Sequence, residues 1–126
     1  FREILDKCQN NISILGICLG HQCIYQYFGG NIKIGTEIVH GKTSEIETDK
    51  EGLFKNLPKK FNVMRYHSLI CDSENIPEEL EVTCATKNGV IMGIKHTTKN
   101  IVGIQFHPES IEGDYGQSIL KSFLIS

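Results

Sequence analysis

The first and last segments of the chain carry apolar residues at the spacing of an amphipathic helix. Phe1, Ile4, Leu5 and Cys8 follow the i, i+3, i+4, i+7 pattern of an amphipathic helix. Residues 12–17 form a nearly continuous apolar run, which predicts a strand buried on both faces. A second helix is expected over residues 20–28, ended by the glycine pair at 29–30.

The middle of the chain alternates between apolar and polar positions and predicts several short strands. We expect these strands at residues 31–34, 42–47, 61–65, 68–71, 80–86 and 90–96. Asn88-Gly89, between the last two, is typical of a tight hairpin turn. A single helical turn is expected at 51–58, an apolar strand at 101–106 and a closing helix at 116–125. This order predicts an α/β fold with an antiparallel extension.

The bulk composition fits one globular domain. The chain has 126 residues, 40% of them hydrophobic and 22% charged, with a formal net charge of -2. Nucleic acids and anionic membranes attract clustered positive charge, which this sequence lacks, so we expect neither as a partner. No apolar run approaches the roughly 20 residues that cross a bilayer, and no signal peptide opens the chain. These features predict a cytoplasmic protein.

Several cysteine and histidine residues are expected to be structural. Cys18-x-x-His21-x-Cys23 superficially resembles a metal cluster, but zinc needs four ligands and no second pair of ligands follows. We therefore expect no metal there. His21, at the start of a helix, is expected to pack or cap, and His96, at the end of a hairpin strand, to be exposed. Core thiols are expected at the four other cysteines, Cys8, Cys23, Cys71 and Cys84.

The segment Gly16-Ile17-Cys18-Leu19-Gly20 has the form glycine, any residue, nucleophile, any residue, glycine. It lies directly between a predicted buried strand and a predicted helix. A nucleophile on such a sharp turn needs flanking glycines because the neighbouring backbone passes close to it. The amino end of the helix favours the Cys18 thiolate, and the backbone N–H of Leu19 can stabilise an oxyanion. The pattern predicts a cysteine nucleophile.

His107 is the best-placed base for this nucleophile. It follows the apolar strand 101–106, and active sites of open α/β folds gather at the carboxyl ends of strands. Glu109 lies two residues further on, so in extended backbone both side chains point the same way, and Pro108 limits how far they separate. Cys18, His107 and Glu109 together predict a Cys-His-Glu triad.

Two segments carry a resemblance to a known family. Residues 16–22, Gly-Ile-Cys-Leu-Gly-His-Gln, and residues 105–110, Gln-Phe-His-Pro-Glu-Ser, are similar to the two signatures of class I glutamine amidotransferases. Two further segments, 40–46 and 65–69, resemble the glutaminase subunit (component II) of anthranilate synthase and of aminodeoxychorismate synthase. The resemblance covers essentially the whole chain, and the four motifs occur in the family's order. It implies a flavodoxin-like open sheet, mostly parallel, with helices on both faces and the antiparallel extension.

The resemblance also implies roles for individual residues. Cys18 would attack the side-chain carboxamide of L-glutamine, His107 would move the protons, and Glu109 would orient the imidazole. Gln22, Ser68 and Leu69 correspond to family positions that bind the substrate glutamine. The ammonia would pass to a chorismate-binding synthase subunit (component I), which makes anthranilate or 4-amino-4-deoxychorismate. No cofactor and no metal are implied for this half-reaction.

The sequence departs from the family at its start. Class I domains usually carry further βα units upstream, and the third supplies an oxyanion loop, so residues 1–126 correspond to the C-terminal two-thirds of the domain. If these residues were the whole protein, we would expect a poor and poorly soluble enzyme. Two alternatives therefore stay open beside the synthase glutaminase. One is a free-standing γ-glutamyl hydrolase, and the other is an inactive fragment that only docks to the synthase.

Overall fold

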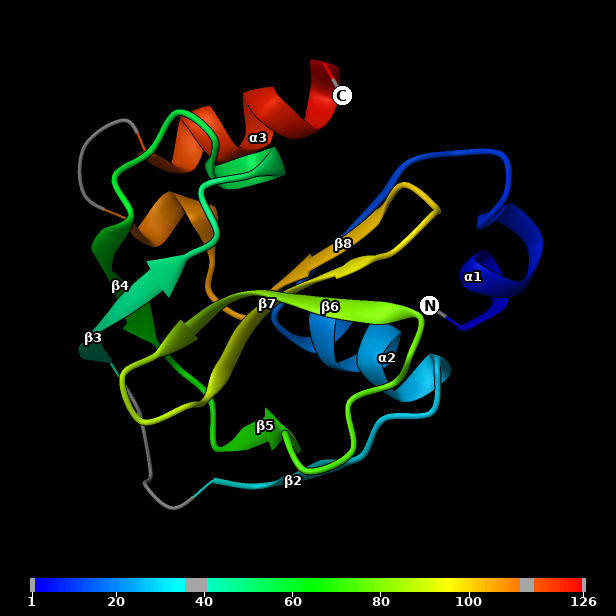
Figure 1. The fold of residues 1–126 in the computed structure, drawn as a ribbon, viewed down its shortest axis with the longest axis horizontal. Helices are drawn as coiled ribbons and strands as arrows, with labels where there is room; N and C mark the ends of the chain where they lie inside the picture. Colours follow the sequence, from blue (N-terminus) through cyan, green and yellow to red (C-terminus); the bar gives the residue numbers. More distant parts are fainter. Residues whose placement is uncertain (1, 36–40, 112–114, 126) are drawn as a thin grey trace.

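The computed structural model describes residues 2–35, 41–111 and 115–125 (Figure 1). Phe1, in the first predicted helix, and His40, in one family-like motif, lie outside the described residues. The helices are α1 (Arg2–Cys8), α2 (Leu19–Tyr27) and α3 (Tyr115–Ile125), with 3₁₀ turns η1 (Gly52–Phe54) and η2 (Pro108–Ser110). The strands are β1 (Ile14–Ile17), β2 (Ile32–Ile34), β3 (Lys42–Thr48), β4 (Lys60–Arg65), β5 (Leu69–Cys71), β6 (Leu80–Thr86), β7 (Ile91–His96) and β8 (Ile101–Ile104). Every element predicted from the sequence is present within a few residues of its expected bounds.

Six strands form one curled, mixed sheet in the order β1-β8-β7-β6-β3-β4, and β2 pairs with β5 separately. The α/β class and the antiparallel extension are confirmed. Within the described sheet, β1 and β8 are the parallel pair, and the other neighbours run antiparallel. The reason is connection length. Tight links join β6 to β7 and β7 to β8, which forces antiparallel pairing, whereas most of the chain separates β1 from β8.

Two apolar cores lie on opposite faces of this sheet. Side chains alternate between faces along a strand, so adjacent residues of β7 enter different cores, Ile91 the first and Met92 the second. The first core packs α1 and α2 against β1, β7 and β8 through residues such as Leu5 and Ile24. The second packs α3 and η1 inside the curl of the sheet, as Figure 1 shows from the position of α3. Helices therefore cover both faces, as expected.

The contact of α2 with the sheet depends on two glycines that face each other across β1 and β8. Gly16 and Gly103 are register partners in the parallel ladder. A Cβ added to Gly16 would lie 2.7 Å from the backbone carbon of Gly20, and one added to Gly103 would lie 3.2 Å from the Cα of His21. Larger residues would push α2 away from the sheet. This pair of glycines sets the distance at which the first turn of α2 lies over β1 and β8.

His21 fills the space beneath that first turn. Its side chain is fully buried, and its Nε2 lies 3.4 Å from the Cys71 sulfur. Burial lowers the pKa of His21 to about 3; the backbone of Gly103 opposes this shift and His67 adds to it slightly. The imidazole is therefore neutral at physiological pH. The expectation that His21 packs is confirmed.

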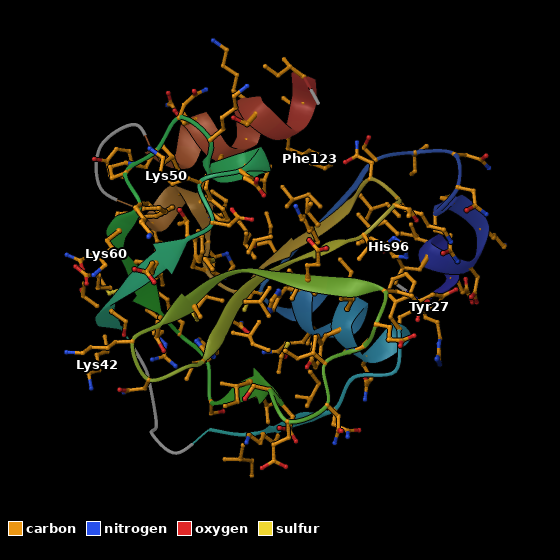
Figure 2. The ribbon with its side chains drawn as sticks, viewed as in Figure 1. Tyr27, Lys42, Lys50, Lys60, His96 and Phe123 are labelled. Carbon is orange, nitrogen blue, oxygen red and sulfur yellow. The ribbon has the colours of Figure 1, made fainter. Side chains whose placement is uncertain are left out.

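The far end of α2 is held by an aromatic row. Phe28 stacks edge-on between Tyr27 and His96, with ring centroids 5.0 and 4.9 Å apart. Figure 2 labels Tyr27 and His96, which lie at the right of the view. His96 is buried, and its Nδ1 accepts the backbone N–H groups of Thr98 and Lys99 at 3.1 and 3.0 Å. The expectation that His96 is exposed is wrong, because it closes the β7–β8 turn.

All five cysteines are free thiols. Cys71 and Cys84 are core residues, and burial raises the pKa of both, that of Cys71 to about 12. Cys8 and Cys23 are only half-buried and are not among the core residues, so the expectation of a core thiol is wrong for these two. No helix in the described part of the chain is long and apolar enough to cross a membrane.

Substitution of Gly16 by alanine tests the close approach of α2. The added methyl would meet the backbone of Gly20, which cannot rotate away, so we expect the free energy of unfolding to fall by about 1–3 kcal/mol. Gly35→Ala is a matched control, since a Cβ there finds only contacts of 3.4 Å or more. Chemical denaturation of the two variants measures the difference, and equal stability would contradict the interpretation.

Substitution of His21 tests its burial in neutral form. Its pKa is lower in the folded chain than in the unfolded one, so the unfolded state binds a proton first on acidification. The stability it contributes is complete above about pH 6.5 and is lost progressively toward pH 3, at about 1.4 kcal/mol per pH unit where the slope is full. His21→Asn should remove this slope. Denaturation curves between about pH 7 and pH 4 measure it, and parallel profiles for the two proteins would refute the prediction.

Candidate active site

Cys18 occupies the sharp turn between β1 and α2 that the sequence predicted. It is the N-cap residue of α2, with φ 56° and ψ -103°. Positive φ is unfavourable for a residue with a side chain and costs about 1–3 kcal/mol. The turn is held by a hydrogen bond from the Cys18 N–H to the Ile104 carbonyl at 2.8 Å and by one from the Gln22 N–H to the Cys18 carbonyl at 3.2 Å. The thiol is therefore fixed at the amino end of α2, where the helix dipole favours negative charge.

His107 and Glu109 are in side-chain contact beyond the end of β8. The His107 Nδ1 lies 3.1 Å from the Glu109 Oε1, and the carboxylate is largely exposed. The backbone between them is not extended as the sequence suggested, because residues 108–110 form the 3₁₀ turn η2 with Pro108 at its first position. α3 packs against this turn so closely that a Cβ on Gly116 would lie 1.9 Å from the Pro108 carbonyl oxygen.

The parallel pairing of β1 and β8 brings the two halves of the predicted triad to one end of the sheet. Ile17 and Ile104 are register partners, so Cys18 leaves the sheet beside the residues that lead to His107. Carboxyl ends of neighbouring parallel strands are where open α/β folds place their sites. In the described chain the Cys18 sulfur is hydrogen-bonded to Gln105 and not to His107. The roles of Cys18, His107 and Glu109 remain predictions.

Gln22 and Gln105 form the buried polar centre of the site. Gln22 points inward from α2, and its Nε2 donates to the Gln105 Oε1 and to the Leu69 carbonyl, both at 3.1 Å. Gln105, which is 1% exposed, donates from its Nε2 to the Cys18 sulfur at 3.7 Å. A role was expected from the sequence for Gln22 but not for Gln105. Gln105 directly follows β8 as Cys18 directly follows β1, and this matching position is the feature of the sequence that indicates a role for Gln105.

The predicted substrate-binding residues Ser68 and Leu69 lie on the other wall of the site. The Ser68 carbonyl accepts the N–H of Gly35 at 2.8 Å, which ties the start of β5 to the end of β2. Leu69 is exposed, but its carbonyl accepts from Gln22. Leu19, the predicted oxyanion donor, is 68% exposed at the first position of α2, where the backbone N–H has no partner within the helix.

A buried histidine and arginine support this wall. The His67 Nδ1 lies 3.0 Å from the Leu69 carbonyl, and the Arg65 Nε donates to the His67 Nε2 at 3.1 Å. Arginine only donates, so the proton of neutral His67 is on Nδ1 and points to the Leu69 carbonyl. Burial lowers the pKa of His67, Leu69 opposes this and Arg65 adds to it. Arg65, His67 and Leu69 alternate along the chain, a period-two signal that the sequence analysis did not use.

No group of three His, Cys, Asp or Glu side chains in the described ranges is arranged to bind a metal ion. His21 and Cys23, suggestive of a ligand set in the sequence, point to different environments: His21 is in the core and Cys23 is half-buried. The chemical groups at this end of the sheet are therefore a thiol, an imidazole, two carboxamides and a carboxylate. Such a set can carry out nucleophilic attack and proton transfer.

Comparison with known proteins gives consistent relatives. The family described as glutamine amidotransferase class-I matches residues 2–126. Anthranilate synthase component 2 of Cyanophora paradoxa is 50% identical over 122 residues, which are 96% of this chain and 64% of that protein. Aminodeoxychorismate/anthranilate synthase component 2 of Bacillus subtilis is 43% identical over 122 residues, 97% of this chain and 63% of that protein. The chain thus spans slightly less than two thirds of each.

A solved structure shares the fold. The crystal structure of a Thermoplasma acidophilum protein, described as one of the subunits of a GMP synthase, superposes with a TM-score of 0.85 at 26% identity. The match covers 98% of this chain and 60% of that one. The fold that contains β1, α2 and β8 is thus shared with a solved structure.

Proposed function

Because the chain belongs to the class I glutamine amidotransferase family, we propose that it releases ammonia from L-glutamine for a chorismate-binding synthase. One observation carries this proposal. Cys18 is held at positive φ at the amino end of α2, and the parallel strand beside it leads to the paired His107 and Glu109. A strained, helix-capping thiol, with an oriented imidazole following the end of the adjacent strand, fits the requirements of cysteine-dependent amide cleavage.

The proposed reaction has two steps. His107 takes the proton of the Cys18 thiol, the thiolate attacks the carboxamide carbon, and the backbone N–H of Leu19 stabilises the oxyanion that forms. The carbon–nitrogen bond then breaks, His107 gives a proton to the leaving ammonia, and a glutamyl thioester remains. Water, deprotonated by His107, cleaves the thioester to glutamate and restores the thiol. Glu109 holds the imidazole in orientation throughout, as its 3.1 Å contact with Nδ1 allows.

Gln22, Ser68 and Leu69 are proposed to hold the substrate glutamine. Gln22 lies on α2 and the other two lie at the start of β5, and the hydrogen bond from Gln22 to the Leu69 carbonyl that joins these two segments supports the proposal. The relatives named component 2 support a synthase partner, since that name implies that the synthase has another component. We propose that this partner is the chorismate-binding subunit of anthranilate synthase or of aminodeoxychorismate synthase.

Labelling with a diazo-ketone analogue of glutamine tests the site itself. The analogue carries the amino acid end of glutamine and alkylates a nucleophile at the carboxamide position, so we expect one adduct, on Cys18, by mass spectrometry. Cys18→Ser should give none. Cys23→Ser is a matched control, because this half-buried thiol lies on the same helix and outside the site, and it should keep the full adduct. A folded wild-type chain without an adduct on Cys18 would contradict the proposal and favour a fragment that only docks.

Addition of the synthase subunit tests the partner. We expect glutamine-dependent ammonia release to rise at least about tenfold when the chorismate-binding subunit is added, since docking completes the site and lowers the barrier by about 1.4 kcal/mol or more. With Cys18→Ser in the complex, the amine product should form from ammonium salts but not from glutamine. Ammonia release that is high and unchanged by the partner would instead indicate a free-standing γ-glutamyl hydrolase.

A further inference from the structure

Gln105 makes contact with both halves of the proposed site from a rigid position. Its backbone N–H donates to the Met92 carbonyl at 2.9 Å, which extends the β7–β8 pairing by one residue. Its side chain is 1% exposed and lies between two functional groups. The Nε2 is 3.7 Å from the Cys18 sulfur, and the Oε1 is 3.1 Å from the Gln22 Nε2. A single buried carboxamide therefore bridges the thiol and the amide on α2.

The orientation of this bridge follows from a backbone group that cannot change its role. The Leu69 carbonyl only accepts hydrogen bonds, so the Gln22 atom that faces it is the nitrogen. The other hydrogen on that nitrogen needs a second acceptor, which is the Gln105 oxygen. The Gln105 nitrogen must then face the sulfur of Cys18. The direction of both side-chain amides is thus set by the chain of hydrogen bonds that begins at β5.

This orientation has consequences at both ends of the bridge. An N–H donor aimed at sulfur stabilises the thiolate relative to the thiol and restricts the rotation of the Cys18 side chain. At the other end, both Nε2 hydrogens of Gln22 are occupied by protein acceptors. The group that Gln22 offers to a ligand is therefore its oxygen, which pairs with a donor such as the ammonium or amide group of an amino acid amide.

We propose that Gln105 is a positioning residue, which holds the Cys18 sulfur through a donated hydrogen bond and the Gln22 carboxamide with its oxygen toward the substrate. The effect on the sulfur stands on the geometry alone. The effect on substrate recognition rests on the proposed glutaminase function. In both cases Gln105 acts through another residue.

Replacement of Gln105 by methionine, which has a similar volume, no hydrogen-bond donor and only a weakly accepting sulfur, tests both effects. The first readout is the rate of Cys18 alkylation by iodoacetamide at neutral pH, resolved by peptide mass spectrometry. This reagent is small and neutral and needs no glutamine pocket. We expect the rate to fall roughly tenfold, because a hydrogen bond to a charged sulfur is lost. The second readout is labelling by the diazo-ketone analogue of glutamine, which should fall at least as much.

Two further Gln→Met variants separate positioning from a general loss of packing. Gln22→Met should slow labelling by the glutamine analogue but slow iodoacetamide alkylation less than Gln105→Met does, since Gln22 acts on the sulfur only through Gln105. Gln9→Met is the remote control. Gln9 also bridges two groups, the Tyr27 hydroxyl and the Lys99 amine, and its loss should change neither rate. Thermal melting followed by circular dichroism checks that each variant is folded. If Gln105→Met does not fold, Gln105→Asn, too short to reach both partners, replaces it.

The outcomes separate this inference from the proposed function. Iodoacetamide alkylation at the wild-type rate in folded Gln105→Met would overturn the inference even if wild-type protein reacts with the glutamine analogue. An equal loss of alkylation in Gln22→Met would also overturn it, because it would indicate collapse of the site. If Gln105→Met slows alkylation but the analogue labels no protein, including wild type, the positioning of the sulfur is supported and the glutaminase proposal fails.

Discussion

The close approach of α2 to the β1–β8 pair is the constraint on which the site depends. Gly16 and Gly103, register partners across the two strands, leave no side chain between the sheet and the first turn of the helix. The helix therefore begins directly after β1, and the residue between them, Cys18, must take a positive φ to make the turn. The same approach buries His21 beneath the first turn, and Gln22 is buried beside it. A wider spacing would remove the strain at Cys18 and the contact between Gln22 and Gln105 together.

A second feature is the polar chain that leads away from the nucleophile. It runs from the sulfur of Cys18 through Gln105 and Gln22 to the Leu69 carbonyl, and from there to His67 and Arg65. Two groups set the donor and acceptor roles along this chain. The Leu69 carbonyl can only accept a hydrogen bond, and the Arg65 guanidinium can only donate one. Hydrogen bonds between buried polar groups in such a chain restrict the geometry of its members. The antiparallel extension, which carries Arg65, is thus joined to the end of β1 by hydrogen bonds as well as by the sheet.

The two sides of the proposed triad are supported by different elements. Cys18 depends on α2 and the sheet, whereas His107 precedes η2 as its N-cap and Glu109 lies within η2, which α3 contacts closely at Gly116. The cores beneath these two supports lie on opposite faces of the sheet. The β1–β8 ladder joins them, because it places Cys18 and the residues that lead to His107 at adjacent strand ends. A shift of one register position in this parallel pair would move the thiol away from Gln105 by about 3.3 Å.

The sequence by itself determined the elements and much of the chemistry. Local patterns placed the helices, the Asn88-Gly89 hairpin and the glycine-flanked turn at Cys18, because spacing and turn preference act over a few residues. Pairing of His107 with Glu109 was expected for the same reason, although the turn that achieves it is 3₁₀ and not extended. Exposure was harder to predict, as His96 is buried and Cys8 and Cys23 are not in the core. Only the tertiary structure decided that Gln105 lies between Cys18 and Gln22. These contacts join residues up to 87 positions apart, and they depend on strand register and helix spacing that no local pattern encodes.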